Sequence, residues 1–284
     1  MKLDNNTNIL IVGLGLLGGS YAKALKKRGF HVNAITLRQE DIDYALQNNM
    51  IDKGSAFVDK NLVSNADLVV FALYPHTFLS WIKDNQHLFK SGAIITDVTG
   101  VKCGVVYEVQ NMLRSDVEFI AAHPMAGRER SGVRHSDDSV FSGANYIVTP
   151  TEKNTPQAIE LCSKLGYTLG FAAVSQLDPE THDKMIAFLS QLTHCIAVTL
   201  MCSSDNEHLV KYTGDSFRDL TRIAKINADM WCELFLMNKG ALLNSMESFE
   251  NSFNRLKTAI ETDDGETIKE MMILSTKRRE AFDR

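Results

Sequence analysis

Short apolar runs alternate with helical patterns along the first half of the chain. The runs cover residues 8–12, 30–37, 67–73, 93–96, 119–122 and 146–148. Each run has the length and the β-rich composition of a strand. Strands that alternate with helices are typical of βαβ units on a parallel sheet. The pattern therefore predicts an α/β fold whose first domain is a Rossmann-like, doubly wound sheet with six strands.

The pattern changes after Pro179, where strand-like runs stop and long helical patterns begin. We expect residues 179–203 to form one helix, because apolar residues recur on one of its faces. From Leu242 to Ile260 the apolar positions step by four and three residues in turn, which is a heptad seam. That seam either packs within its own domain or forms a subunit interface, and its length favours the interface of a homodimer.

The change in pattern also divides the chain into two domains. We expect a dinucleotide-binding Rossmann domain over residues 1–175 and an all-α helical domain for substrate binding and dimerisation over residues 176–284. With 284 residues, the chain is long enough for both domains to bury a core.

Composition and charge narrow the classes of partner. The net charge is −5 and the pI is about 5.9, which argues against nucleic acid or an anionic membrane as the partner. No apolar run approaches the roughly 20 residues that span a bilayer, and the first eight residues do not resemble a signal peptide. The five cysteines show no C-x-x-C spacing, as expected for reduced thiols. We therefore expect a soluble cytoplasmic protein without a metal site.

A glycine-rich turn stands between the first predicted strand and the first predicted helix. It reads Gly-Leu-Gly-Leu-Leu-Gly, with the cofactor-binding candidates Gly13, Gly15, Leu16, Leu17 and Gly18. In the G-x-G-x-x-G pattern the glycines permit a tight turn, close approach of a pyrophosphate, and close packing of helix on strand. Free N–H groups at the start of the helix then face the phosphates. The context predicts binding of NAD or NADP.

The choice between NAD and NADP depends on the end of the second predicted strand. An acid there normally binds the 2′-OH of NAD, but this stretch carries Thr36 and Arg38 and no acid. A hydroxyl and a guanidinium suit a 2′-phosphate, so NADP is favoured. Two alternatives stay open: Arg38 is a solvated loop charge, or Glu40 or Asp41 binds the 2′-OH if the loop bends.

A histidine follows the run at 119–122, in a place where open α/β sheets bind ligands. From His123 the sequence reads His-Pro-Met-Ala-Gly, and Glu-Arg-Ser-Gly follows at 129–132. Further along stand Asp-Leu-Thr-Arg-Ile-Ala at 219–224 and Met-Trp at 230–231. In these pieces, their order and their spacing, the chain resembles the prephenate dehydrogenase family of tyrosine biosynthesis, which includes arogenate dehydrogenases.

The resemblance implies an enzyme, an NAD(P)-dependent oxidoreductase that decarboxylates a cyclohexadienyl substrate oxidatively. It also implies a Rossmann domain followed by a helical domain, as in 6-phosphogluconate dehydrogenase. A hydride leaves the carbon bearing the hydroxyl, and carbon dioxide departs as the ring becomes aromatic. By resemblance, His123 is the catalytic base and Arg222 binds a substrate carboxylate.

The resemblance also implies further site residues. His194 and Gln191 are expected to contact substrate from the first helix of the second domain, and Glu129 to order the site entrance. Trp231 either reaches the neighbouring subunit's site or is a buried core aromatic. Thr99 stands where the order of glycine and hydroxyl residue is reversed relative to relatives, and is a candidate to assist His123.

Three alternatives to a prephenate dehydrogenase remain at this stage. Arogenate as substrate differs only in its side chain, and nothing in the sequence decides between the two. A β-hydroxyacid dehydrogenase would need a catalytic lysine in the helical domain, for which Lys184, Lys211 and Lys225 are available. A catalytically silent NADP-binding regulatory protein gives no reason for the presence of both His123 and Arg222.

Overall fold

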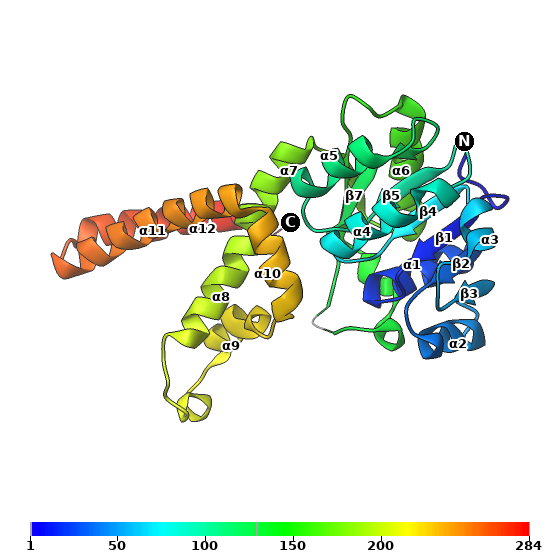
Figure 1. Cartoon of the computed structure of the whole chain (residues 1–284). Helices are drawn as coiled ribbons and strands as arrows, with labels where there is room; N and C mark the ends of the chain where they lie inside the picture. The colour runs from blue at the N-terminus through cyan, green and yellow to red at the C-terminus, as the bar shows by residue number, and fades with distance from the viewer. Residues whose placement is uncertain (1, 129, 284) are drawn as a thin grey trace.

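The computed structural model describes residues 2–128 and 130–283, and its strands form two sheets (Figure 1). The strands are β1 Asn8–Val12, β2 His31–Ile35, β3 Lys53–Ser55, β4 Leu68–Phe71, β5 Ile94–Asp97, β6 Glu118–Phe119, β7 Ala121–Pro124, β8 Asn145–Thr149 and β9 Ala173–Gln176. The larger sheet is parallel, with the order β3-β2-β1-β4-β5-β6. This is the strand order of a Rossmann sheet, so the predicted fold class is confirmed.

Helices cover both faces of this sheet. They are α1 Leu16–Lys26, α2 Gln39–Gln47, α3 Lys60–Ser64, α4 Pro75–Asn85, α5 Cys103–Met112 and α6 Pro156–Leu169. Alternate residues of β1 point to opposite faces: Ile9 and Ile11 belong to the core shared with α1 and α6, while Leu10 and Val12 face α4 and α5. Both faces are buried, which explains why the strands read as continuous apolar runs.

The smaller sheet has the order β7-β8-β9, and it starts where one strand was expected over 119–122. That run divides into β6 and β7 because the Asp97 carboxylate, at the end of β5, accepts the N–H of Ala122 at 3.0 Å. His123 therefore lies within β7, not beyond the end of a strand as the sequence had indicated. Strands β3 and β9 were not predicted; β3 has only three residues, and most of β9 is exposed.

The second half of the chain is helical. Its helices are α7 Pro179–Ile186, α8 Thr193–Cys202, α9 Asp215–Thr221, α10 Ala228–Met237, α11 Lys239–Glu261 and α12 Gly265–Arg279. The predicted helix over 179–203 is present, with a π-helical segment Ala187–Leu192 joining α7 to α8. Helices α11 and α12 pack on each other as a hairpin that extends away from the sheet (Figure 1).

The two halves meet where α7 packs on α5. The hydroxyl of Tyr107 on α5 donates to the Glu180 carboxylate on α7 at 2.6 Å. A second contact joins α4 to α10, where Nδ1 of His76 lies 3.0 Å from the Glu233 carboxylate. These contacts bring the carboxyl ends of β5 and β7 close to the first helix of the second half.

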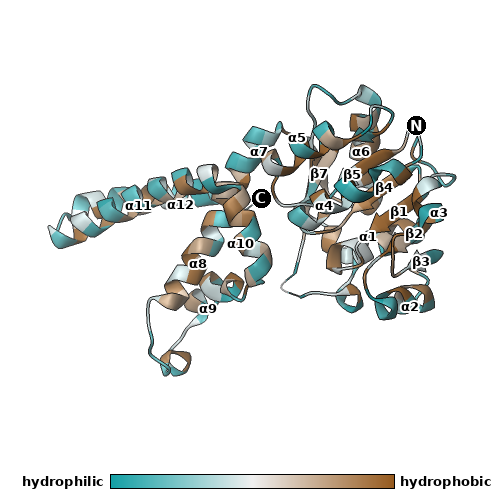
Figure 2. Cartoon of the chain, in the orientation of Figure 1, coloured by the Kyte–Doolittle hydropathy of each residue, from teal (hydrophilic) through white to brown (hydrophobic). Residues whose placement is uncertain are grey.

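Much apolar surface of the helical half is exposed in the single chain. Figure 2 shows hydrophobic residues along α8 and α10, and exposed apolar side chains continue along α11 and α12. One helix of the described chain, Pro179–Cys202, is long and apolar enough to cross a bilayer by length and composition, and 28% of its apolar window is buried. Exposed apolar surface of this extent is typical of an interaction site.

Candidate active site

The glycine turn has the geometry that a dinucleotide needs. Gly13 has a φ of +100°, which favours glycine, and a Cβ there would lie 2.5 Å from the carbonyl oxygen of Ala72. A Cβ on Gly18 would lie 1.9 Å from the carbonyl oxygen of Gly13, so the start of α1 packs directly on the turn. A Cβ on Gly15 would meet nothing within 4 Å, because this glycine faces open space where a ligand can approach.

The start of α1 supplies the donors that a pyrophosphate requires. Leu16 and Leu17 begin the helix, and Gly15 precedes it with no side-chain cap. The first N–H groups of a helix have no partner within the helix, and the helix dipole favours an anion there. The residues of this turn therefore fit a bound NAD or NADP.

The end of β2 places Thr36 and Arg38 at the edge of this site. Thr36 follows the strand directly and its N–H donates to the carbonyl of Ser55. The Arg38 side chain is 63% exposed and lies between two carboxylates, with Nε 3.0 Å from Asp41 and Nη1 3.3 Å from Glu40. Both acids that sequence reasoning held as alternatives are thus neighbours of the guanidinium.

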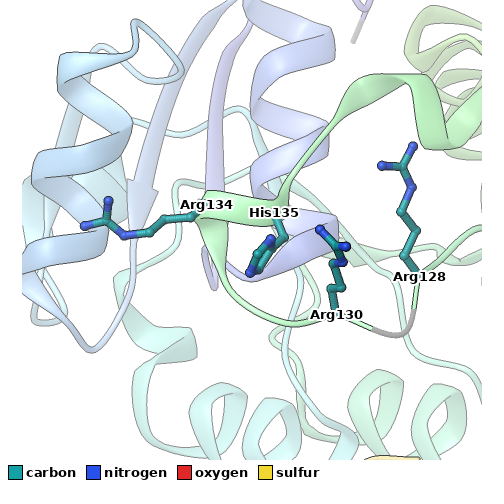
Figure 3. Close-up of a pocket in the computed structure, with 4 residues that line it drawn as sticks. All are labelled: Arg128, Arg130, Arg134 and His135. Atoms are coloured by element: carbon teal, nitrogen blue, oxygen red, sulfur yellow. The ribbon is translucent and has the colours of Figure 1, made fainter. Parts of the chain in front are cut away.

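A basic concavity lies near the glycine turn (Figure 3). It has a volume of about 500 Å³ and is lined by Arg128, Arg130, Arg134 and His135. Arg134 extends to α2, where its guanidinium lies 4.8 Å from the centroid of the Tyr44 ring. The segment that follows packs on α1. In a chain of net charge −5, this concentration of positive charge favours anionic ligands on this side of the molecule.

A buried network holds the loop between β5 and α5. Lys102 and Asp97 are both fully buried, and Lys102 Nζ lies 2.8 Å from the Asp97 carboxylate and 2.6 Å from the carbonyl of Ala122. The Thr99 hydroxyl donates to Asp97 and accepts from Lys102 at 3.2 Å. The Thr99 hydroxyl therefore bonds within this network. The sequence had suggested that Thr99 assists His123, but among the described residues the two form no hydrogen bond.

His123 projects from β7 toward α7. Its Nδ1 lies 2.9 Å from Nε2 of His182, a fully buried residue that the sequence analysis did not single out. Burial, with smaller effects from His182 and Lys102, lowers the pKa of His123 well below its usual 6.5. The ring is therefore neutral at physiological pH, as a general base must be.

His182 continues to Asp183, its neighbour on α7. Nδ1 of His182 lies 2.8 Å from Oδ1 of Asp183. The same carboxylate accepts the N–H groups of Lys102 and Cys103 at 2.8 Å each, at the start of α5. Burial alone would raise the pKa of Asp183, but the donors from His182, Cys103 and Lys102 lower it, so the group is a carboxylate. The three residues form a chain from one half of the molecule to the other.

The helical half contributes His194, Trp231 and Arg222. The His194 and Trp231 rings stack with centroids 3.7 Å apart, and Nδ1 of His194 lies 2.8 Å from the carbonyl of Ser190. Arg222 is exposed and opens a short 3-10 helix, Arg222–Ala224, that packs on α8. Trp231 is partly buried and stacks on His194 of its own chain. This contact is compatible with a core aromatic, and a reach into the neighbouring subunit's site stays a prediction.

Gln191 ties α10 to the long helix. It is buried, its amide donates to the carbonyl of Leu234 at 3.0 Å, and its carbonyl accepts from Asn238 at 2.8 Å. Its expected contact with substrate stays a prediction. Glu129, the other candidate for the site entrance, lies outside the described residues.

Two family models match the chain over most of its length. The nucleotide-binding domain model of prephenate dehydrogenase matches residues 21–172, and the dimerization domain model of prephenate dehydrogenase matches residues 178–274. The chain belongs to the prephenate dehydrogenase family. Prephenate dehydrogenase of Bacillus subtilis is 32% identical over an alignment of 271 residues. The alignment covers 92% of this chain and 72% of that relative.

Two further family relatives extend this result. A cyclohexadienyl dehydrogenase of Zymomonas mobilis is 28% identical over an alignment of 283 residues. The alignment covers 97% of this chain and 96% of that relative. The crystal structure of prephenate dehydrogenase from Aquifex aeolicus, in complex with hydroxyphenyl propionate and NAD+, is 32% identical with a TM-score of 0.89. That match covers 98% of each chain. Family membership thus holds for both halves of the molecule.

Proposed function

We propose that this protein is a prephenate dehydrogenase, an NAD(P)-dependent enzyme that converts prephenate to 4-hydroxyphenylpyruvate in the synthesis of tyrosine. The observation that carries the proposal is a neutral histidine, His123, held by His182 in the nucleotide-binding half of a chain of this family. The proposed domain division is 1–175 for the dinucleotide and 176–284 for substrate and dimerisation.

The dinucleotide is held by the glycine turn and the start of α1. Gly13 makes the turn, Gly15 leaves room for the phosphates, and the N–H groups at Leu16 and Leu17 donate to them. When bound, the nicotinamide supplies the hydride acceptor. Gly18 is proposed to serve the cofactor by keeping the start of the helix close to the turn.

His123 takes the proton of the substrate hydroxyl as the hydride leaves the same carbon. The hydroxyl carbon becomes a carbonyl carbon, the ring carboxylate departs as carbon dioxide, and the electrons of that C–C bond complete the aromatic ring, which leaves the oxygen as a phenolate. That oxygen takes the proton back from His123 and becomes the phenol of the product. The protein's tasks are then to hold one proton and to orient the ring. The low pKa of His123 keeps the accepting nitrogen available at neutral pH.

The helical half anchors the substrate. Arg222 is the proposed partner of a substrate carboxylate, since a guanidinium binds a carboxylate through two parallel hydrogen bonds. His194, stacked on Trp231, is the proposed second contact. Arogenate differs from prephenate in the side chain that these residues would meet, and it remains the alternative substrate.

NADP is the proposed preferred dinucleotide. The end of β2 carries no acid, and Arg38 is exposed beside it, so its guanidinium is the proposed partner of a 2′-phosphate. That phosphate has to compete with the carboxylates of Glu40 and Asp41, which lie 3.3 Å and 3.0 Å from the guanidinium. If either acid bound a 2′-OH instead, NAD would be preferred.

The protein is proposed to work in the cytoplasm as a homodimer formed by the helical half. The seam on α11 is mostly exposed in the single chain, with Phe253 58% and Ile260 59% exposed, which is unusual for a helix that packs only on its own domain. A second copy that covers α8, α10 and α11 would also account for the apolar composition of Pro179–Cys202. Neither nucleic acid nor a membrane is a proposed partner.

One assay matrix tests these proposals. The purified protein is given prephenate or arogenate with NAD or NADP, and reduced cofactor is followed by absorbance. We expect turnover with prephenate, at least as fast with NADP as with NAD. Turnover with arogenate alone would move the substrate to the alternative, and no turnover with either would favour the silent regulatory protein. A β-hydroxyacid dehydrogenase is disfavoured because the family models of prephenate dehydrogenase match residues 21–172 and 178–274.

A further inference from the structure

We infer that His182 and Asp183 fix the tautomer of His123 and so select its Nε2 as the atom that receives the substrate proton. The catalytic part of this inference rests on the proposed function. The tautomer is a property of the protein alone and can be measured without substrate.

The argument starts from the carboxylate, which has no proton to donate. Oδ1 of Asp183 lies 2.8 Å from Nδ1 of His182, so the hydrogen of that bond must reside on Nδ1. Two main-chain N–H groups, from Lys102 and Cys103, also point at this carboxylate and stabilise its charged form. Nδ1 of His182 is therefore the donor in the first link of the chain.

The second link follows from the first. A neutral imidazole carries one N–H, so with its hydrogen on Nδ1 the Nε2 atom of His182 holds a lone pair. That atom lies 2.9 Å from Nδ1 of His123, which must then be the donor. In the neutral His123 ring this leaves Nε2 as the acceptor. An isolated imidazole has no such constraint, because either nitrogen can carry the hydrogen.

The neutral state of the two rings agrees with their surroundings. His182 is fully buried, and it faces the Asp183 carboxylate, the Lys102 ammonium and, further away, the Asp97 carboxylate. Lys102 and Asp97 are themselves paired at 2.8 Å, so their opposite charges offset each other and neither favours protonation of the histidines by itself. Burial outweighs the effect of Asp183 and lowers the pKa of His182.

The nitrogen selected in this way is the one that His182 does not occupy. A Cβ built on Gly100 would lie 3.8 Å from Nε2 of His123 and 3.6 Å from a side-chain methyl of Leu234, so a side chain at position 100 would pack against this nitrogen. Nδ1 is engaged by His182, and His123 is only partly buried by area, so Nε2 is the nitrogen left for a substrate hydroxyl.

The chain also crosses the boundary between the two halves. His123 belongs to β7, while His182 and Asp183 belong to α7, which packs on α5. The accepting tautomer is thus fixed only when α7 sits on α5, because the same carboxylate binds the start of α5 and the His182 ring. His182 and Asp183 are positioning residues, and they act on the reaction through His123.

Nitrogen NMR of the protein labelled with ¹⁵N-histidine tests the tautomer directly. At pH 7.5 we expect His123, assigned by its loss in His123→Asn, to show a protonated Nδ1 and an unprotonated Nε2. We expect His182→Leu to give His123 a mixture of the two tautomers, because its acceptor is gone. An Nε2–H tautomer of His123 in the unaltered protein would overturn the inference, whatever the activity of the enzyme.

Kinetics then test the consequence. His182→Leu is expected to lower kcat by about 10–10²-fold with KM for substrate unchanged, while His182→Gln, whose side-chain oxygen can accept from His123, stays within about fivefold of the unaltered enzyme. In the His123→Asn background, His182→Leu should cause no further loss. The control is His87→Leu on the exposed 3-10 helix Gln86–Leu88, which should change nothing.

The outcomes separate this inference from the proposed function. Equal losses in His182→Leu and His182→Gln, or a full additional loss in the His123→Asn background, would overturn the positioning role while dehydrogenase activity stands. If the unaltered protein turns over no cyclohexadienyl substrate, the proposed function fails and the NMR result still decides the tautomer. Unchanged thermal unfolding of His182→Gln would verify that its fold is intact.

Discussion

The two halves of the molecule differ in how far they bury their own apolar residues. In the nucleotide-binding half, two large clusters fill both faces of the sheet and include most residues of β1, all of β4 and half of β5. Among the described residues of the helical half, few apolar side chains are buried: Pro179, Ile186, Ala187, Leu192, Ala197, Leu242 and Ala259. The first half can hold its fold with its own core, whereas the second depends on contacts from outside the single chain.

The same difference separates the proposed chemical roles. His123 sits among buried hydrogen-bonded groups that cannot shift without cost, as a proton acceptor requires. Arg222 is exposed on a short 3-10 helix, as suits a group that meets a ligand arriving from solvent. The proposed proton acceptor is held in the half with its own core, and the proposed anchor of the substrate carboxylate lies in the half that lacks one.

Breaking the proposed dimer should produce the largest effect. Phe253→Asp on α11 places a charge in the exposed seam. Burying a Phe contributes about 1.5–3 kcal/mol, and a two-fold interface contains each residue twice, so the dimer dissociation constant should rise by about 10²–10⁴-fold. Light scattering at micromolar concentration measures this, with Asn251→Asp on the same helix as the control. A fully active monomer of the unaltered protein would contradict the dependence of the helical half on a partner.

The division between chemistry and binding predicts two different kinetic defects. His123→Asn should lower kcat by about 10²–10⁴-fold with little change in KM, the range for loss of a general base. Arg222→Ala should act chiefly through KM for the substrate, because a carboxylate anchor contributes equally to ground-state and transition-state binding. Steady-state kinetics with prephenate separate the two. Near-normal turnover by His123→Asn would show that the assigned base is wrong.

A substitution of Arg38 should have a smaller effect, limited to cofactor binding by the nucleotide-binding half. Arg38→Ala should raise KM for NADP and leave KM for NAD nearly unchanged, a discrimination of about 1.5–3 kcal/mol for one charge-assisted contact. Lys53→Ala, at the amino end of β3, is the control for a general loss of positive charge. Equal losses with both cofactors would mean that Arg38 only supports its loop.

The pH dependence of stability should give the smallest effect. The pKa values of His123 and His182 are lowered in the folded protein, so the unfolded chain takes up protons at a higher pH than the folded one. Stability is then fully present above the unfolded value of about 6.5 and declines as pH falls below it. Urea unfolding at pH 7.5 and 5.5 should differ by about 1 kcal/mol, and by less in His182→Gln. A stability that rises on acidification would contradict the burial of two neutral rings.

Local patterns predicted the parts of the fold that depend on local physics. The glycine turn, the helix after it and the seam of α11 each follow from residue types at fixed spacing, and each is present. Strand β9 escaped prediction because most of its side chains are exposed, so it lacks the apolar signal of a buried strand. The split into two sheets escaped as well, because it depends on a side chain, Asp97, that takes the place of a main-chain partner.

The sequence predicted which residue types form the site better than it predicted which groups their side chains contact. The sequence singled out His123 but gave no sign of its partner, since His182 lies 59 residues further along and meets it only through the packing of α7 on α5. The available signal was a His-Asp pair in the first turns of a helix at the domain boundary. Thr99 was expected to assist His123 and Gln191 to contact substrate. Both side chains form hydrogen bonds with buried groups nearby, which spacing along the chain cannot reveal, and the two roles stay predictions.

The π-helical segment Ala187–Leu192 gives the long helix a property that its residue types do not. Each residue of an α-helix turns the chain by about 100°, and a π turn accommodates one residue more than an α turn. Deleting one residue within this segment would replace a π turn by an α turn and keep His182 and His194 on their present faces, whereas deleting one residue elsewhere between them would rotate His194 by about 100° relative to His182. The π segment is therefore the one place in the long helix where a change of chain length leaves the angle between its two ends intact.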